Sequence, residues 1–291
     1  MDGDQQHDAV STENLLAQTL ARIEIPPRPV LLDKVMAEMQ SDDPDFRELA
    51  RIITADVGMA ASLIKTANAP FFGLRNKAST VRDALTMLGL LSVLRTIASH
   101  ALRQALPVTP ALEGFWERST RIAYLCGWLV RQVGVKEGIR VDDAYTYGLF
   151  HDCGIPILMR TFDGYQGTYS AVSSEPDRPL TLLEMERHDL NHAMVGCALA
   201  KSWFLPEIHA QAILHHHDAD VLAPEPSEIP ASIRRLIALG HAAEWLDQSS
   251  DPAHDHEWLR IGPTCLTILN LTGELLAELK PEAQSFLKDH V

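Results

Sequence analysis

The stretch Tyr147-Gly148-Leu149-Phe150-His151-Asp152-Cys153-Gly154 decides how the fold of this chain is interpreted. It places a histidine directly before an aspartate at the far end of an apolar segment with helical spacing. Further along the chain stand His192 and the run His215-His216-His217. Imidazoles and a carboxylate that meet from separate helices are the donors that a hydrolytic site with bound metals requires. The candidate metal ligands are His151, Asp152, His192, His216 and His217.

The composition indicates a packed protein rather than a disordered one. Of the 291 residues, 46% are hydrophobic, which is enough for a sizeable core. The formal net charge is -14, and this acidity argues against a broad interface with a phosphate backbone. We therefore expect no nucleic-acid partner.

Cysteine usage and hydropathy both favour a cytoplasmic protein. The four cysteines are widely separated and lie in apolar helical patterns without metal-ligand pairing, which indicates buried thiols in a reducing compartment. No apolar run approaches the roughly 18 residues of a membrane span, and Met1-Asp2-Gly3-Asp4 does not begin a signal peptide. We expect no membrane segment.

Apolar residues recur three and four positions apart nearly everywhere from Leu15 onward, which predicts an all-α fold. Helix starts are expected at Asp45, Asp56 and Ser79-Thr80, with a break at Leu88-Gly89. In the second half, helices are expected at Leu180–His188, His192–Trp203, Pro206–His215, Pro230–Leu246 and Pro263–Lys280. Loops are expected at Asp218–Ile229 and Gln248–Glu257.

Two features divide the chain. Residues 1–13 are polar and acidic, and we predict a flexible tail there. Pro107 and Pro110 mark a boundary between two helical lobes, at 14–108 and 109–291.

Short motifs run through both lobes in a fixed order. The first lobe contains Ile25-Pro26-Pro27-Arg28-Pro29, Glu48-Leu49-Ala50, Leu63-Ile64-Lys65-Thr66-Ala67-Asn68-Ala69 and Ala84-Leu85 with Leu88-Gly89. The second contains Phe115-Trp116-Glu117-Arg118-Ser119, the His151-Asp152 segment, Glu184 before His192-Ala193, Trp203-Phe204-Leu205-Pro206, and Ala212-Ile213 ahead of His216-His217. From about Ile25 to Trp245 the chain resembles the HDOD family, the non-catalytic bacterial signalling relatives of the HD-domain metallophosphohydrolases.

The resemblance implies a fold and a role. It implies an HD-like helical bundle in the C-terminal lobe and an output or adaptor function in bacterial signal transduction. The partners that it implies are signalling proteins, namely a response regulator, a kinase or a second-messenger enzyme. A homodimer is compatible with such a role.

The chain departs from the catalytic HD pattern at several positions. Arg118 stands where catalytic relatives place a metal-binding histidine, and a guanidinium has no lone pair to offer a cation. Ile155 replaces a lysine, and His241 stands where an aspartate is expected. No Gly-Tyr-Pro follows His217, which disfavours a cyclic-dinucleotide phosphodiesterase. The degenerate HD pocket then consists of Arg118, His151, Asp152, Glu184, His192, His216, His217 and His241.

Arg118 suggests a physical replacement for a lost cation. We hypothesise an ion pair between Arg118 and Asp152, because a buried carboxylate requires a compensating charge. His216 and His217 are expected to face the pocket, and His215 to pack elsewhere. A packing contact for His241 is favoured over a ligand role. The remaining candidates for exposure are His209, His254, His256 and His290.

Two functions follow. The favoured one is a non-catalytic regulatory module that binds a protein partner or a small ligand and needs no cofactor. The alternative is a metal-dependent phosphohydrolase that acts on a nucleotide or second messenger, with Zn, Fe, Mn or Ni on the surviving nitrogen and oxygen donors.

Overall fold

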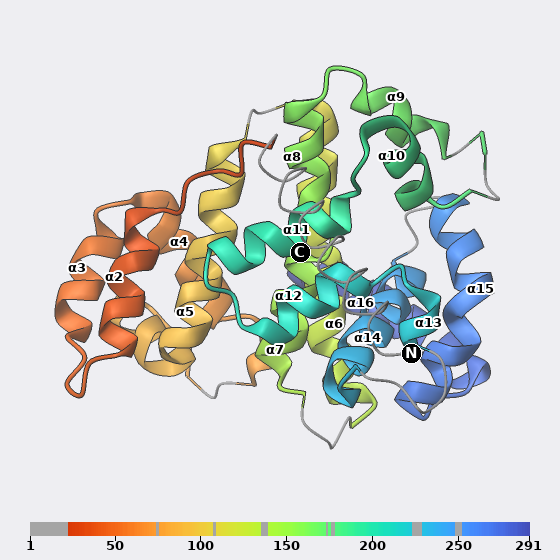
Figure 1. Ribbon diagram of the computed structural model, residues 1–291. Coiled ribbons are helices and arrows are strands. Elements are labelled where there is room, and N and C mark those ends of the chain that lie inside the picture. Colours follow the sequence, from red (N-terminus) through yellow and green to blue (C-terminus); the bar gives the residue numbers. More distant parts are fainter. Residues whose placement is uncertain are drawn as a thin grey trace, which may run out of the picture.

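The computed structural model describes residues 23–73, 76–106, 109–134, 139–172, 174–175, 178–222, 229–247 and 252–291. Within these ranges the regular elements are all helices, which confirms the all-α class (Figure 1). The tail predicted for residues 1–13 lies outside the described residues. The division into two lobes near residue 108 stays a prediction.

The N-terminal helices begin where polar side chains can satisfy their free amide groups. They are α2 (Val30–Met39), α3 (Phe46–Thr54), α4 (Val57–Ala67), the 3-10 helix η1 (Pro70–Phe72) and α5 (Val81–Ala105). Asp45, Asp56 and Thr80 accept hydrogen bonds from the first turns of α3, α4 and α5. These three predicted helix starts are therefore confirmed.

Helix α5 is broken at Gly89, which has a φ of 75° and a ψ of 162°. An L side chain rarely adopts this conformation, so the glycine permits the bend that Leu88-Gly89 predicted. Contrary to expectation, α5 is long and apolar enough to cross a membrane by length and composition alone. Half of its apolar window is buried, and it packs against α2, α3 and α4. This is the behaviour of a core helix.

The second half of the chain contributes the helices that surround the histidines. They are α6 (Pro110–Gln132), α7 (Val141–Phe150), α8 (Gly154–Thr161), α9 (Tyr165–Ala171), α10 (Leu180–His188), α11 (His192–Ser202), α12 (Glu207–His215), α13 (Ala219–Leu222), α14 (Ala231–Leu246), α15 (Pro252–Leu269) and α16 (Gly273–His290). The predicted ends of α10, α11, α12 and α14 agree with these bounds to within one residue.

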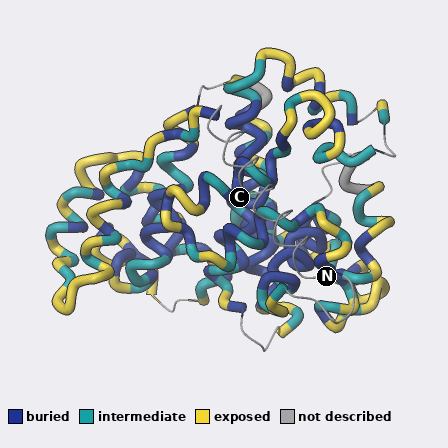
Figure 2. Tube along the Cα trace, in the orientation of Figure 1, coloured by how far each residue is buried: buried dark blue, intermediate teal, exposed yellow. Residues whose placement is uncertain are grey.

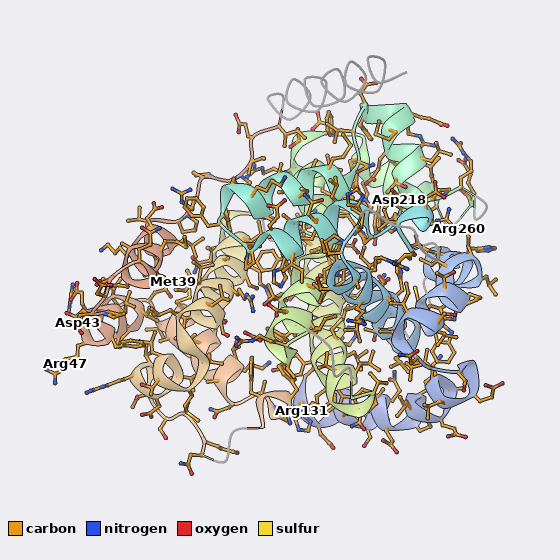
Figure 3. The ribbon with its side chains drawn as sticks, turned by 60° about the horizontal axis from the view of Figure 1, so that its bottom comes forward. Met39, Asp43, Arg47, Arg131, Asp218 and Arg260 are labelled. Carbon is orange, nitrogen blue, oxygen red and sulfur yellow. The ribbon has the colours of Figure 1, made fainter. Side chains whose placement is uncertain are left out.

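The prediction was wrong around Pro263. That proline lies inside α15, which begins at Pro252 in a stretch predicted as loop. The chain instead turns at Asn270, whose φ of 53° is left-handed. The amide of Leu271 closes the turn on the carbonyl of Leu266 at 2.9 Å. The predicted loop after Asp218, which Figure 3 labels, likewise contains the short helix α13, which contacts α15.

Helices α6, α7, α11, α12 and α14 form the buried centre of the molecule (Figure 2). Two glycines allow close approach between backbones. A Cβ on Gly148 of α7 would lie 2.8 Å from the Cα of Ala123 in α6. A Cβ on Gly154 of α8 would lie 2.0 Å from the carbonyl oxygen of His192, where α11 begins. Side chains at the ends of α7 and α11 are thus brought together.

Gly154→Ala is expected to lower the free energy of unfolding by about 1–3 kcal/mol, because the added methyl group would overlap the backbone of α11. The matched control is Gly114→Ala in α6, where an added Cβ meets nothing within 4 Å. That control should be neutral or stabilising by up to about 1 kcal/mol. Chemical denaturation of both variants measures the difference, and equal stabilities would contradict the close contact.

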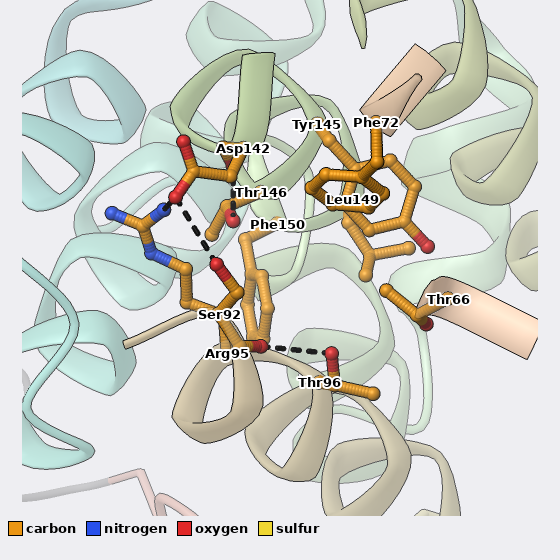
Figure 4. A pocket seen from close by; sticks show the side chains of 10 residues that line it. All are labelled: Thr66, Phe72, Ser92, Arg95, Thr96, Asp142, Tyr145, Thr146, Leu149 and Phe150. Carbon is orange, nitrogen blue, oxygen red and sulfur yellow. Dashed lines mark hydrogen bonds and ion pairs between the residues drawn. The ribbon is translucent and has the colours of Figure 1, made fainter. Parts of the chain in front are cut away.

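A buried ion-pair network joins α5 to α7 (Figure 4). Arg95 donates to Asp142 at 3.0 Å and to Asp143 at 2.5 Å, and the side chain of Arg95 is only 4% exposed. Ser92 also donates to Asp142, at 3.1 Å. Arg131, labelled in Figure 3, adds a second link by donating to the carbonyl of Phe71 in η1. Polar contacts therefore fix the N-terminal helices to α6 and α7.

His209 was predicted to be exposed, and this is wrong. It is fully buried, and its Nε2 lies 3.1 Å from the carbonyl oxygen of Asp143. Burial, together with the nearby Arg95, lowers the pKa of His209, so the ring is neutral and Nε2 donates this bond. His256 is exposed as predicted, His290 is partly buried, and the side chain of His254 lies outside the described part.

Candidate metal centre

His151 and Asp152 lie in the turn between α7 and α8 rather than within a helix. Because the chain turns there, both side chains serve one pocket. Nε2 of His151 lies 3.2 Å from one carboxylate oxygen of Asp152. The other oxygen lies 3.2 Å from Nε2 of His216 and 3.4 Å from Nε2 of His192. Asp152 is thus the carboxylate at the centre of the histidines.

His192 is the first residue of α11 and is oriented by a buried carboxylate. Asn191 caps the helix by accepting from the amide of Met194. Nδ1 of His192 lies 2.7 Å from the Oε2 atom of Glu184, which is fully buried. The hydroxyl of Tyr165 donates to the other oxygen of Glu184. Glu184 and Tyr165 therefore hold the imidazole so that Nε2 faces Asp152.

His216 and His217 follow the C-terminal end of α12, and both face the pocket as predicted. Nδ1 of His216 lies 2.7 Å from the carbonyl oxygen of Ile213. Nδ1 of His217 lies 2.7 Å from the Oε1 atom of Glu257 in α15. His215 is 25% exposed, and its Nδ1 lies 3.7 Å from the carboxylate of Asp218. One imidazole of the run is thus excluded from the pocket.

Four of these residues form a compact cluster, the tetrad Asp152, His192, His216 and His217. One ligand atom from each lies within 4.8 Å of all the others. Nε2 of His192 is 2.9 Å from Nε2 of His217 and 3.4 Å from Nε2 of His216. Because each Nδ1 faces an acceptor, the Nε2 lone pairs converge. Lone pairs at this distance repel unless a proton or a cation lies between them.

The tetrad fits one divalent transition-metal ion. Two nitrogens bound to one tetrahedral ion at about 2.0–2.1 Å stand roughly 3.3 Å apart, close to the separations within the tetrad. Burial and the neighbouring His217 lower the pKa of His216 to about 3, which leaves its lone pair available. Burial also disfavours a charge on His192, but Glu184 and Asp152 outweigh this and raise its pKa to about 10. A bound cation would release that proton.

A second group beside the tetrad contains His151, Asp152 and Glu244. Arg118 donates to Glu244 at 3.1 Å, so the hypothesis of an Arg118–Asp152 ion pair was wrong about the partner. The physical reason is that α6 packs against α14, which carries Glu244, whereas Asp152 faces the imidazoles. The guanidinium of Arg118 therefore places a positive charge next to Glu244, the carboxylate that would bind a second cation.

His241 packs against this second group and does not belong to the tetrad. Its Nε2 lies 2.7 Å from the carbonyl oxygen of His216, and its Nδ1 lies 3.2 Å from Glu244. Both ring nitrogens are thus engaged, in agreement with the packing interpretation. Nε2 of His151 is buried 3.2 Å from Asp152 and 3.5 Å from Glu244, although neither contact has hydrogen-bond geometry. His151 accordingly borders the tetrad and faces the Arg118–Glu244 pair.

Three residues of the centre were missed in the sequence. Glu257 lies in a stretch predicted as loop, Tyr165 lies in a segment without clear helical spacing, and Glu244 lies three residues after His241. The spacing of Glu244 from His241 along one helix is the only signal that could have indicated it.

Comparison with models of protein families identifies the family of the chain. The model of the HDOD domain matches residues 25–219. The chain belongs to the HDOD family. The expected resemblance is thereby confirmed for about two thirds of the chain.

One sequence relative and several solved structures resemble the chain at low sequence identity. An uncharacterized protein of Treponema pallidum (strain Nichols) is 25% identical over 238 residues, which are 81% of this chain and 45% of that protein. The chain therefore spans less than half the length of this relative. A Geobacter sulfurreducens HDOD domain protein of unknown function aligns with a TM-score of 0.65 and 22% identity, over 94% of this chain and 95% of that one.

Two further solved structures carry functional descriptions. A Shewanella amazonensis SB2B protein described as a candidate phosphohydrolase has a TM-score of 0.65 and 18% identity, over 95% of this chain and 98% of that one. A Marinobacter aquaeolei VT8 protein described as a candidate signal-transduction protein has a TM-score of 0.60 and 16% identity, over 96% and 65%. At this identity the likeness shows the HD-like fold alone.

Proposed function

We propose that this HDOD protein is a non-catalytic regulatory module of bacterial signal transduction, which acts in the cytoplasm by binding a protein partner or a small ligand. The observation that carries the proposal is the Arg118–Glu244 pair. A fixed guanidinium stands beside the carboxylate of the second cation group. The partner class would be a response regulator, a kinase or a second-messenger enzyme, and a homodimer is compatible with it.

The chemistry of phosphate-ester hydrolysis explains why this pair argues against catalysis. Two-metal hydrolases hold cations about 3.5–4 Å apart, so that one activates water and the other stabilises the leaving oxygen. Here the tetrad offers donors for one cation, and Arg118 neutralises Glu244 beside it. Ile155, which stands in place of a cationic lysine, is buried and apolar. Two sources of positive charge for a phosphate are thus missing.

We further propose that the tetrad holds one divalent ion with a structural role. Its donors come from the turn after α7, the start of α11 and the end of α12. An ion bound by all four residues would tie these three places together. Zn, Fe, Mn and Ni all accept imidazole and carboxylate ligands.

A hydrolysis panel tests the absence of catalysis. Purified protein would be assayed with nucleoside mono-, di- and triphosphates and cyclic dinucleotides, with added Mn²⁺ or Fe²⁺. We expect the wild-type rate to equal that of Asp152→Ala, because neither protein assembles a two-cation site. Wild-type turnover that Asp152→Ala abolishes would contradict the proposal.

Wild-type turnover that Asp152→Ala abolishes would support a second candidate function, a metal-dependent phosphohydrolase acting on a nucleotide or second messenger. The compact tetrad favours it, since His192, His216, His217 and Asp152 converge as metal ligands do. His151, whose Nε2 lies within 3.5 Å of both Asp152 and Glu244, would then serve the second ion.

A further inference from the structure

A cavity separate from the metal centre lies where α4 and α5 meet α6 and α7. Its volume is about 570 Å³, within the range of about 300–1,000 Å³ that small-molecule sites usually occupy. None of the tetrad residues lines it. Tyr145, Thr66 and Leu149 belong to its wall, and Figure 4 shows them where they also line a neighbouring, smaller pocket. An occupant would therefore touch helices from both sides of the Arg95 network.

The cavity is cationic although the chain is acidic overall. Lys65 of α4 and Arg103 of α5 line it, and neither forms an ion pair with a described residue. Arg103 instead lies over the ring of Trp116, with its guanidinium carbon 5.7 Å from the ring centre. Glu113 is the one acidic side chain on the wall, and it is exposed. Two cations are thus available to an anionic ligand.

The part of the wall that α6 and α7 form is aromatic and carries hydroxyl groups. Trp116 and Tyr124 are buried in α6, and Tyr145 is half-buried in α7. The rings of Tyr124 and Tyr145 meet edge to face, with centres 5.9 Å apart. This aromatic surface is suited to contact with a flat ring, and the hydroxyl groups of Ser62 and Thr120 also line the cavity. Cations beside aromatic rings suit a ligand with both a charge and a ring.

We propose that this cavity binds a small anion that carries a flat ring, of the nucleoside-phosphate class. Arg103 and Lys65 pair with its phosphate, and the aromatic wall contacts its ring. The inference deepens the proposed function and rests on it for its regulatory meaning, since α6 and α7 border both sites. Trp116 and Tyr124 line the cavity from α6, which also carries Arg118. Binding here thereby biases the arrangement of helices that a partner recognises.

Calorimetric titration of the full chain with AMP and GMP tests the proposal, in buffer with EDTA so that metal-dependent binding is suppressed. We expect binding that Arg103→Ala weakens by about 10–100-fold, because a charge-assisted hydrogen bond is worth about 1.5–3 kcal/mol. Arg82→Ala is the matched control, since Arg82 is an exposed arginine of the same helix outside the cavity. It should leave the affinity unchanged.

Titrations with three further ligands test which part of the nucleotide the cavity recognises. Adenosine, guanosine and inorganic phosphate should each bind at least about tenfold more weakly than the nucleotides, because each lacks either the charge or the ring. Equal affinity of inorganic phosphate would overturn the ring contact. No nucleotide binding, or binding unaffected by Arg103→Ala, would overturn the site. Loss of binding in His217→Ala but not in Arg103→Ala would place the nucleotide in the metal centre and overturn it too. If the protein hydrolysed nucleotides but still bound AMP and GMP in this cavity, only the proposed non-catalytic function would be contradicted.

Discussion

Replacing His217 with alanine is expected to lower the affinity of the chain for Zn²⁺ or Mn²⁺ at least about 100-fold. The substitution removes one of three converging imidazoles, in which Nε2 of His192 lies 2.9 Å from that of His217 and 3.4 Å from that of His216. Even residues that only orient a ligand contribute about 10–100-fold to metal affinity, so loss of a direct ligand should cost at least as much. Competition with a chromophoric chelator measures the dissociation constant.

His215→Ala provides the matched control, because it removes the same side chain two residues away. His215 is 25% exposed and directed to Asp218, so its loss should change the metal affinity less than about twofold. Equal losses in the two variants would show that the histidine run binds metal without the tetrad geometry. A retained affinity in His217→Ala would likewise contradict the tetrad.

Replacing Arg95 with methionine is expected to lower the free energy of unfolding by about 3–5 kcal/mol, because it leaves two carboxylates without their buried partner. Arg95 is 4% exposed and pairs with both Asp142 and Asp143. Its removal should also loosen the junction of α5 with α7. Urea denaturation followed by circular dichroism gives the change in unfolding free energy.

Arg140→Met is the control on the same carboxylate. Arg140 lies 2.9 Å from Asp142, but its side chain is 72% exposed, so water and salt screen the pair. Its loss should cost no more than about 1 kcal/mol. If both variants lost the same stability, burial of Arg95 would not be the source of the effect.

Local signals in the sequence were enough to predict much of the fold. Asp45, Asp56 and Thr80 cap helices because each can accept from amides two or three residues ahead, and no distant contact is needed. Gly89 breaks α5 for an equally local reason. Each tetrad residue was also a candidate, since histidines and an aspartate at predicted helix ends are recognisable before the helices are placed.

Features that depend on distant contacts could not be predicted in this way. Glu257 meets His217 only because α15 begins early and packs beside α13 and α14. His209 is polar and was predicted to be exposed, but the packing of α12 on α7 buries it. Arg118 pairs with Glu244 rather than Asp152 for the same reason, since helix packing decides which carboxylate faces which cation. Pro263 was misread because a proline can lie within a long helix whose ends are fixed elsewhere.

The number of divalent ions bound per chain tests the central claim most directly. The claim is that the guanidinium of Arg118 takes the place of a second cation, so that the remaining donors bind a single metal ion. Elemental analysis of protein equilibrated with excess Mn²⁺ or Zn²⁺ and then freed of unbound metal should give one ion per chain. Two ions per chain would contradict the account, because the Arg118–Glu244 pair would then coexist with a complete two-metal site.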